Sequence, residues 1–291
     1  MADIPKKVED RLIEGLKKYQ PIIVSLKDKD VNESDTVTLV TDLLADVFGF
    51  DKYTEITREH SIRGTYVDLA IILSGKIQLL IEVKAIGLEL KENHVRQAVD
   101  YASNEGVEWV ALTNGAIWHI YKVSFTKPIT FELVLQINLS ELNFRTGSHI
   151  ESLFLLTKEA LGKSALEDFH NKKQATSKYC ISAVLLSETG LSFLRRELRR
   201  LAPNIKVDLD EIEATLTSEV IKREIFDGEE LKASIRKVKK VTANKQSPKN
   251  ATEKLEKPDN EEEQDVDIQE SAEPKEEIIK EVQKNSNQSN P

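Results

Sequence analysis

Residues 66–84, YVDLAIILSGKIQLLIEVK, decide the predicted fold, because two apolar segments flank a short turn. Residues 66–73 and 77–84 are rich in β-branched and aromatic side chains, which is typical of strands. Ser74, Gly75 and Lys76 lie between them and are predicted to form a three-residue turn. The stretch is therefore predicted to be a β-hairpin.

The register of this hairpin determines which side chains meet. With a three-residue turn, Leu73 lies opposite Ile77 and Asp68 lies opposite Glu82, and cross-strand partners point to the same face. Because side chains alternate along a strand, Lys84 shares the face of Glu82. A slip of one residue would send the two acids to opposite faces. The predicted register therefore gathers two carboxylates and one ammonium group.

Two carboxylates that face each other repel, so a fold tolerates them best when a cation lies between them. Carboxylate oxygens suit Mg²⁺, which proteins hold through one or two carboxylates together with waters and phosphate oxygens. A nearby ammonium group can orient or help to deprotonate a metal-bound water. These groups are sufficient for metal-assisted hydrolysis of a phosphodiester.

The spacing of Asp68, Glu82 and Lys84 resembles the signature of PD-(D/E)xK nucleases, although Val67 stands where the signature has proline. The flanking sequence resembles the N-terminal nuclease domain of type I restriction enzyme R subunits, especially short stand-alone proteins with that domain. The similar segments occur in the same order, over roughly residues 5–125: residues 32–36, 62–65, 82–85, 97–101 and 112–115.

This resemblance implies a Mg²⁺-dependent DNA endonuclease, with Mn²⁺ as a substitute ion. Asp68, Glu82 and the carbonyl of Val83 would bind the metal, and Lys84 would position or activate the attacking water. Glu33 matches the acid that completes the metal site in the family. From its position alone, Glu33 is equally an acid in a first helical turn that interacts with the helix dipole.

Further site residues follow from the same resemblance. Residues 92–103 are predicted to form a helix with His94, Gln97 and Tyr101 on one face, and Gln97 and Tyr101 match a QxxxY element that supports the site and contacts DNA. A polar face on a surface helix is the alternative. Arg58 and Arg63 are candidates for phosphate contacts, or simply solvated charges in a loop.

The fold class predicted for residues 1–147 is α/β, a mixed sheet flanked by helices as in restriction endonucleases. The amphipathic helix at residues 6–19 is expected to stop at Pro21. Asn32 is expected to cap a second helix, which Gly49 ends. Strands are expected at residues 107–112 and 117–123, joined at an Asn-Gly turn, and an edge strand at 131–137.

A helical domain is predicted for residues 148–240, with helices at 150–161, 165–170, 174–200, 209–225 and 231–240, the third broken by Gly190. Arg195 and Arg199 lie opposite a leucine stripe, where they either bind DNA phosphates or form solvated surface. Residues 162–164 resemble the end of a nucleotide-binding loop. That loop lacks its first glycine, which is Thr157 here, so no nucleotide is expected. The remaining residues are too few for a helicase motor.

Composition limits the class of protein. The 291 residues are 40% hydrophobic and 31% charged, with a formal charge of −9. Residues 241–291 contain 13 acidic residues and 7 lysines and no aromatic residue, so we expect a disordered acidic tail. Cys180 is the sole cysteine, which excludes an internal disulfide. No apolar run is long enough for a membrane span, and we expect a cytoplasmic protein.

The sequence thus favours a restriction-type DNA endonuclease that works with DNA and with restriction-modification partner subunits. The alternative is a non-cleaving module that keeps the nuclease fold and binds DNA or a partner protein. The missing motor and the arginine face at residues 195–200 favour this alternative. The complete set of Asp68, Glu82 and Lys84 argues against it.

Overall fold

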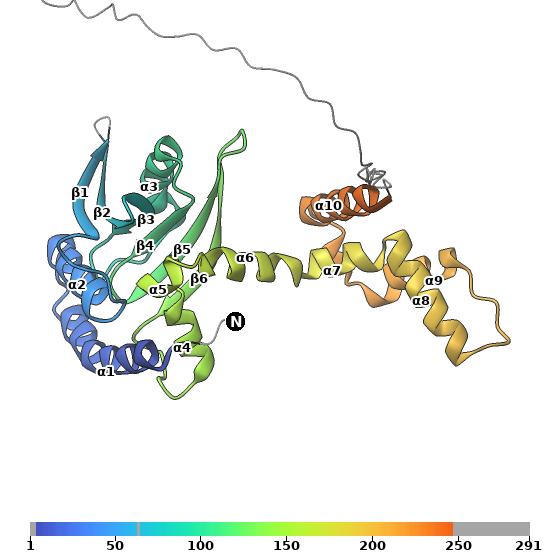
Figure 1. Ribbon diagram of the computed structural model, residues 1–291, viewed down its shortest axis with the longest axis horizontal. Helices are drawn as coiled ribbons and strands as arrows, with labels where there is room; N and C mark the ends of the chain where they lie inside the picture. Colours follow the sequence, from blue (N-terminus) through green and yellow to red (C-terminus); the bar gives the residue numbers. More distant parts are fainter. Residues whose placement is uncertain (1–3, 63–64, 247–291) are drawn as a thin grey trace, which may run out of the picture. The chain divides into compact units, whose positions relative to one another are not determined.

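The computed structural model describes residues 4–62 and 65–246 (Figure 1). The chain divides into two compact units, residues 1–244 and 245–291. Nearly all of the second unit lies outside the described residues, including most of the predicted acidic tail. The first six residues assigned to that tail, 241–246, belong instead to a helix, α10 (Glu229–Gln246).

The described part of the chain contains a six-stranded sheet in which sequence neighbours are also spatial neighbours, in the order β1-β2-β3-β4-β5-β6. Strands β3 and β4 are parallel, and the other neighbours are antiparallel. Helix α3 (Glu92–Glu105) makes the crossover that a parallel pair requires. The strands are β1 (Ile56–Ile62), β2 (Thr65–Leu73), β3 (Lys76–Val83), β4 (Trp109–Thr113), β5 (Ile117–Ser124) and β6 (Thr130–Asn138).

Helices cover both faces of the sheet, which confirms the predicted α/β fold class (Figure 1). One face packs on α1 (Lys6–Asp28) and α2 (Glu33–Asp46) in a core that extends to Leu166. The other face packs on α3, through small and branched side chains such as Ala98 and Val95. The boundary expected at residues 147 and 148 stays a prediction.

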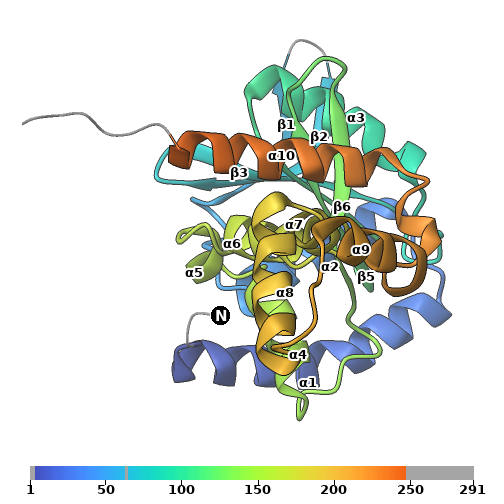
Figure 2. The ribbon, with the colours of Figure 1, turned by 90° about the vertical axis from the view of Figure 1, so that its right-hand side faces the viewer.

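Helix α1 is longer than expected, because Pro21 does not end it (Figure 2). Proline removes one backbone donor, but Pro21 lies on the exposed side of the helix, where water can satisfy the freed carbonyl. Ile23, two residues later, is buried in the core and holds the last turns in place. Packing therefore outweighs the local preference of proline.

Helix α2 begins as predicted. The side chain of Asn32 accepts a hydrogen bond of 2.9 Å from the N–H of Asp35. The helix ends at Asp46, and Gly49 follows with a φ of +84°. Arg11 of α1 ties this end down, because its guanidinium group donates to the carbonyls of Val47 and Phe48.

The hairpin between β2 and β3 has a two-residue turn, and the predicted three-residue turn is wrong. Ser74 and Gly75 have φ values of +51° and +75°, and Leu73 pairs with Lys76. Two positive φ values are the geometry of a type I′ turn, whose twist matches that of the strands. A one-residue bulge in β3 then shifts the pairing between Ile71 and Ile72 of β2.

Strands β4 and β5 join at the expected Asn-Gly turn, where Gly115 has a φ of +81°. Trp118 and Tyr121 of β5 are buried in the cores on the two faces of the sheet. Strand β4 begins at Trp109, two residues later than expected. Strand β6 lies at the edge of the sheet, as expected.

Beyond the sheet the described chain is helical, but two of the predicted helices, 150–161 and 174–200, are divided into shorter ones, whereas α6 and α10 are longer than predicted. Three of the breaks have the same cause, a hydroxyl side chain that caps the next helix. Thr157, Ser177 and Ser187 accept from the N–H of the residue three positions later. The helices are α4 (Gly147–Phe154), α5 (Lys158–Leu161), α6 (Ala165–Ala175), α7 (Lys178–Leu185), α8 (Glu188–Leu201) and α9 (Leu209–Thr215), then short turns η1 (Leu216–Val220) and η2 (Arg223–Ile225), and α10.

Gly190 does not break a helix, contrary to the prediction; it lies in the first turn of α8. A Cβ atom there would lie 2.2 Å from the carbonyl oxygen of Val184, so only glycine allows α8 to begin this close to α7. Helices α7 to α10 share a small core of their own, which includes Leu191 and Ile212. None of the described helices combines the length and apolar character that a membrane span requires.

Candidate active site

The two acids of the hairpin meet as the sequence predicts. The described pairs between β2 and β3 reach Leu69 and Ile81, and the same register places Asp68 opposite Glu82 one step further. The shorter turn and the bulge have opposite effects on the strand register, because the turn has one residue fewer than predicted and the bulge adds one residue to β3. Beyond the bulge the register is therefore the predicted one. Both acids therefore point to the face of the sheet that α3 covers.

Lys84 joins the acids at the end of β3. Its Nζ lies 2.6 Å from Oε1 of Glu82 and 3.5 Å from Oε2 of Glu33. The side chains of Lys84 and Glu82 are only 18% and 7% exposed, whereas that of Glu33 is 49% exposed. Glu33 is the first residue of α2, so the start of that helix reaches the end of β3, as the resemblance implies.

Asp68 is fixed by the backbone of the neighbouring strand. Its Oδ2 accepts a hydrogen bond of 2.7 Å from the N–H of Val83, the residue between Glu82 and Lys84. This bond holds the carboxylate of β2 beside Glu82 and Lys84, the neighbours of Val83 along the chain. A role of the Val83 carbonyl as a metal ligand stays a prediction.

The electrostatics reflect the crowding of charge. Burial raises the pKa of Glu82, and the charges of Asp68 and Glu33 add to this, while the hydrogen bond from Lys84 acts in the opposite direction. Burial alone would lower the pKa of Lys84, but the hydrogen bond to Glu82 and the three surrounding acids raise it. Lys84 is therefore a stable ammonium group, suited to stabilise negative charge.

The α3 residues are only partly placed as expected. Gln97 is exposed, but Tyr101 is buried among the side chains beneath α3, so it does not belong to a polar surface face. Burial raises the pKa of its phenol, with a smaller contribution from Glu105. His94 accepts from the N–H of Lys91 and so belongs to the start of the helix.

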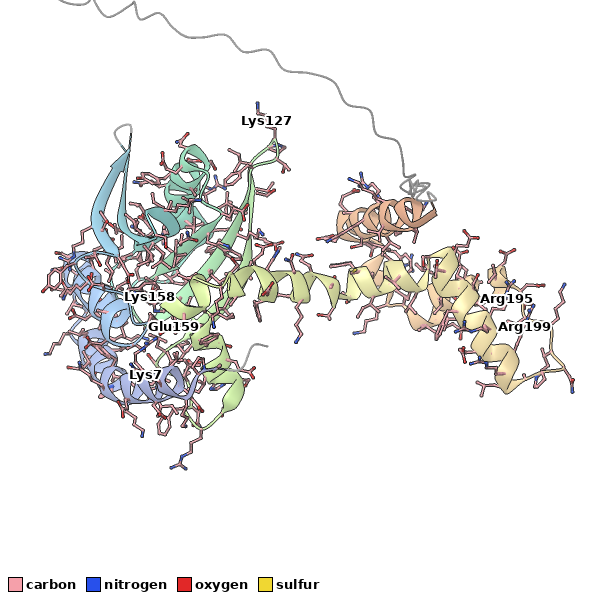
Figure 3. The ribbon with its side chains drawn as sticks, in the orientation of Figure 1. Lys7, Lys127, Lys158, Glu159, Arg195 and Arg199 are labelled. Atoms are coloured by element: carbon pink, nitrogen blue, oxygen red, sulfur yellow. The ribbon has the colours of Figure 1, made fainter. Side chains whose placement is uncertain are left out.

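The arginines divide into three cases. Arg58 donates to the hydroxyl of Thr41 in α2 and is therefore held by the fold instead of extending from a loop. Arg63 lies outside the described residues. Arg195 and Arg199 project from α8, whereas Arg196 and Arg200 pair with Glu197 between them (Figure 3). The leucine stripe of α8 is buried only at its start, because Leu198 and Leu201 are 39% and 83% exposed.

Asn114 was assigned only to a turn by the sequence, yet it is a buried polar residue, 4% exposed, beside the end of β3. Its side-chain amide donates to the carbonyls of Ile86 and Leu88, which follow Lys84 along the chain. The Asn-Gly pair predicts the turn, but nothing in the sequence indicates these contacts.

The donors present fit a hard divalent cation, since they are carboxylates that lie within reach of one ammonium group. They do not form a ready-made cage. In the described residues, no group of three or more His, Cys, Asp or Glu side chains is arranged to hold a metal ion. Glu82 and Glu33 are turned toward Lys84, and Asp68 toward Val83. The metal site therefore stays a prediction.

Comparison with known proteins identified one family. Residues 40–137 match the model described as type I restriction enzyme R protein N terminus (HSDR_N), which confirms the resemblance over this stretch. Asp68, Glu82 and Lys84 lie inside the matched region, and Glu33 lies outside it. No curated protein and no solved structure matched the chain. The match supports a restriction-related, nuclease-like function for the sheet domain.

Proposed function

We propose that this protein is a Mg²⁺-dependent DNA endonuclease that hydrolyses phosphodiester bonds. The observation that carries the proposal is the convergence of Asp68, Glu82 and Lys84 at the end of one hairpin, with Glu33 reaching the same ammonium group. A purely structural pair would need one acid for one lysine. The additional like charges of partly buried Asp68 and half-exposed Glu33 fit a site built for a cation.

Each side chain has a role that its surroundings support. Asp68 and Glu82 would hold the metal with the Val83 carbonyl, and Glu33 would bind a second ion or its waters. When bound, Mg²⁺ or its substitute Mn²⁺ would lower the pKa of a water and polarise the phosphate. Lys84, a stable ammonium group, would orient the water and offset the charge that develops on the phosphate.

DNA contacts beyond the reacting phosphate would come from other elements. Gln97 is exposed on α3 and can reach DNA directly, whereas buried Tyr101 would support the geometry from beneath. Arg195 and Arg199 would contact DNA phosphates, and Arg63 is a further candidate. Restriction-modification subunits are the partners that the family match suggests.

A test of the proposal is the conversion of supercoiled plasmid to nicked and linear forms by the purified protein. We expect cleavage with Mg²⁺, none with EDTA, and at least a 100-fold slower rate for Lys84→Met. Equal cleavage by the parent and the variant would mean that the activity is not from this site.

The alternative is a module that binds DNA or a partner without cleaving it. Glu82 pairs with Lys84 and Asp68 accepts from the N–H of Val83, and these contacts with protein groups favour the alternative. It predicts DNA binding that weakens with salt, is unchanged in Lys84→Met, and never leads to cleavage with any divalent ion.

A further inference from the structure

Residues 84–91, which follow β3, form no helix or strand. Strand β3 ends at Val83, the N–H of Lys84 donates to the carbonyl of Thr113 at 2.8 Å, and residues 85–91 then lead to α3. The direction in which Lys84 is presented therefore depends on what holds this loop. The same loop sets where α3, with Gln97, begins.

Asn114 holds the loop from the β4–β5 turn. Its Nδ2 donates to the carbonyl of Ile86 at 3.2 Å and to the carbonyl of Leu88 at 3.0 Å. The two hydrogens of one amide are thus used on two carbonyls that are two residues apart. Ile86 is 1% exposed, so few other donors can reach this carbonyl.

The other end of the same side chain is fixed as well. Oδ1 of Asn114 accepts from the N–H groups of Ala116 and Ile117, at 3.2 and 2.8 Å. The turn packs closely on α2, since a Cβ atom on Gly115 would lie 2.8 Å from Leu39. Asn114 therefore connects a closely packed turn to an irregular loop, with all of its hydrogen-bonding capacity in use.

The loop itself is closely packed on its far side. A Cβ atom on Gly87 would lie 2.2 Å from Oδ1 of Asp30, in the connection between α1 and α2. The loop is thus held between Asp30 and Asn114, directly after Lys84. In enzymes, displacing a reacting group by about 1 Å can cost a factor of about 100 in rate.

We infer that Asn114 is a positioning residue of the site: its side-chain amide fixes residues 85–88 and so holds Lys84 and Glu82 in the cleaving geometry. The inference rests on the proposed function in its catalytic part. Asn114 acts through the loop and does not touch the substrate.

Two variants of Asn114 test this positioning role, because both lose the amide that donates to the loop. Asn114→Asp keeps the shape and the acceptor of the turn but loses both donors. Asn114→Ser keeps a hydroxyl that can accept in the turn, is neutral, and is too short to reach the loop. The same two substitutions at Asn138, whose Oδ1 accepts from the N–H of Ser140, are matched controls.

The experiment combines hydrogen exchange of residues 84–91 with single-turnover plasmid cleavage at saturating Mg²⁺. In both Asn114 variants we expect the amides of this loop to exchange at least 10-fold faster than in the parent. We also expect the cleavage rate to fall at least 10-fold. We expect the protein concentration that gives half of the maximal single-turnover rate to change less than threefold, and both Asn138 variants to match the parent. A merely structural role would lower thermal stability and leave the rate of the folded protein unchanged.

The outcomes are distinguishable from those of the proposed function. Parental protection in the loop of both variants, or a parental cleavage rate, would overturn the inference. A parent that does not cleave would instead refute the proposed function, and the exchange data would still decide whether Asn114 holds the loop.

Discussion

Removal of the ammonium group at Lys84 is the perturbation whose consequences follow most fully from the structure. Lys84→Met keeps the length of the side chain and leaves Glu82, only 7% exposed, beside Asp68 without its counter-charge. Breaking one partner of a buried pair typically costs about 3–5 kcal/mol. Glu82 can escape part of this cost by taking up a proton, so we expect roughly 2–3 kcal/mol at pH 8.

The loss of stability in Lys84→Met depends on pH, and the raised pKa of Glu82 decides in which direction. Burial already raises the pKa of Glu82 above 4.5, and loss of Lys84 raises it further. Above pH 4.5 the folded variant then keeps a proton on Glu82 that the unfolded chain has released. Stability falls as the pH rises through this window, by at most about 1.4 kcal/mol per pH unit. The cost of Lys84→Met is therefore smaller at pH 5.5 than at pH 8.

The assay is urea unfolding in EDTA, followed by the fluorescence of Trp109 and Trp118, which both lie in the sheet. The double variant Glu82→Gln, Lys84→Met removes both charges and should recover at least half of the loss at pH 8. A double variant no more stable than Lys84→Met, or a cost that is equal at both pH values, would refute the pairing described here.

Three further perturbations test other parts of the structure. Gly190→Ala places a methyl group 2.2 Å from a backbone carbonyl and should cost about 1–3 kcal/mol by thermal unfolding, whereas Gly147→Ala, with open space around it, should cost nothing. Burial lowers the pKa of His119, so stability should fall as the pH drops below about 6.5, and His119→Phe should reduce that fall in urea midpoints. Glu33→Gln, at a half-exposed position, should slow plasmid cleavage by about 3–10-fold, and a 100-fold loss would give Glu33 a larger role than its distance from Lys84 suggests.

The hairpin shows how far sequence reasoning reached and why. Apolar patterning identified both strands, and the pairing of Asp68 with Glu82 was predicted correctly. The turn was wrong because Ser74 adopts a positive φ, which is uncommon outside glycine, asparagine and aspartate. The bulge restored the register, and no residue in β3 marks it, so the correct pairing followed from two deviations that cancel.

Other errors came from local rules that tertiary packing overrode. Pro21 is a helix breaker in isolation, but the buried Ile23 continues α1 past it. Gly190 was read as a break, although the close approach of α7 requires it. Arg58 was assigned to a loop, as a phosphate contact or a solvated charge, but it lies in β1 and donates to Thr41.

Some residues of the candidate site could be predicted from local sequence spacing, and others could not. Asp68, Glu82 and Lys84 were found because they lie on one hairpin, where sequence spacing gives geometry. Glu33 was placed through the resemblance. The contacts of Asn114 join segments about 26 residues apart, and no periodicity reports on such a contact.

The central claim is that Asp68 and Glu82 act as a pair on a scissile phosphate, and single-turnover cleavage of plasmid by Asp68→Asn tests it most directly. Asp100→Asn, an exposed acid on α3, removes the same charge away from the pair and is the matched control. The account predicts at least a 100-fold loss for Asp68→Asn and parental rates for Asp100→Asn. Cleavage by Asp68→Asn at the parental rate, with the same dependence on Mg²⁺, would contradict it.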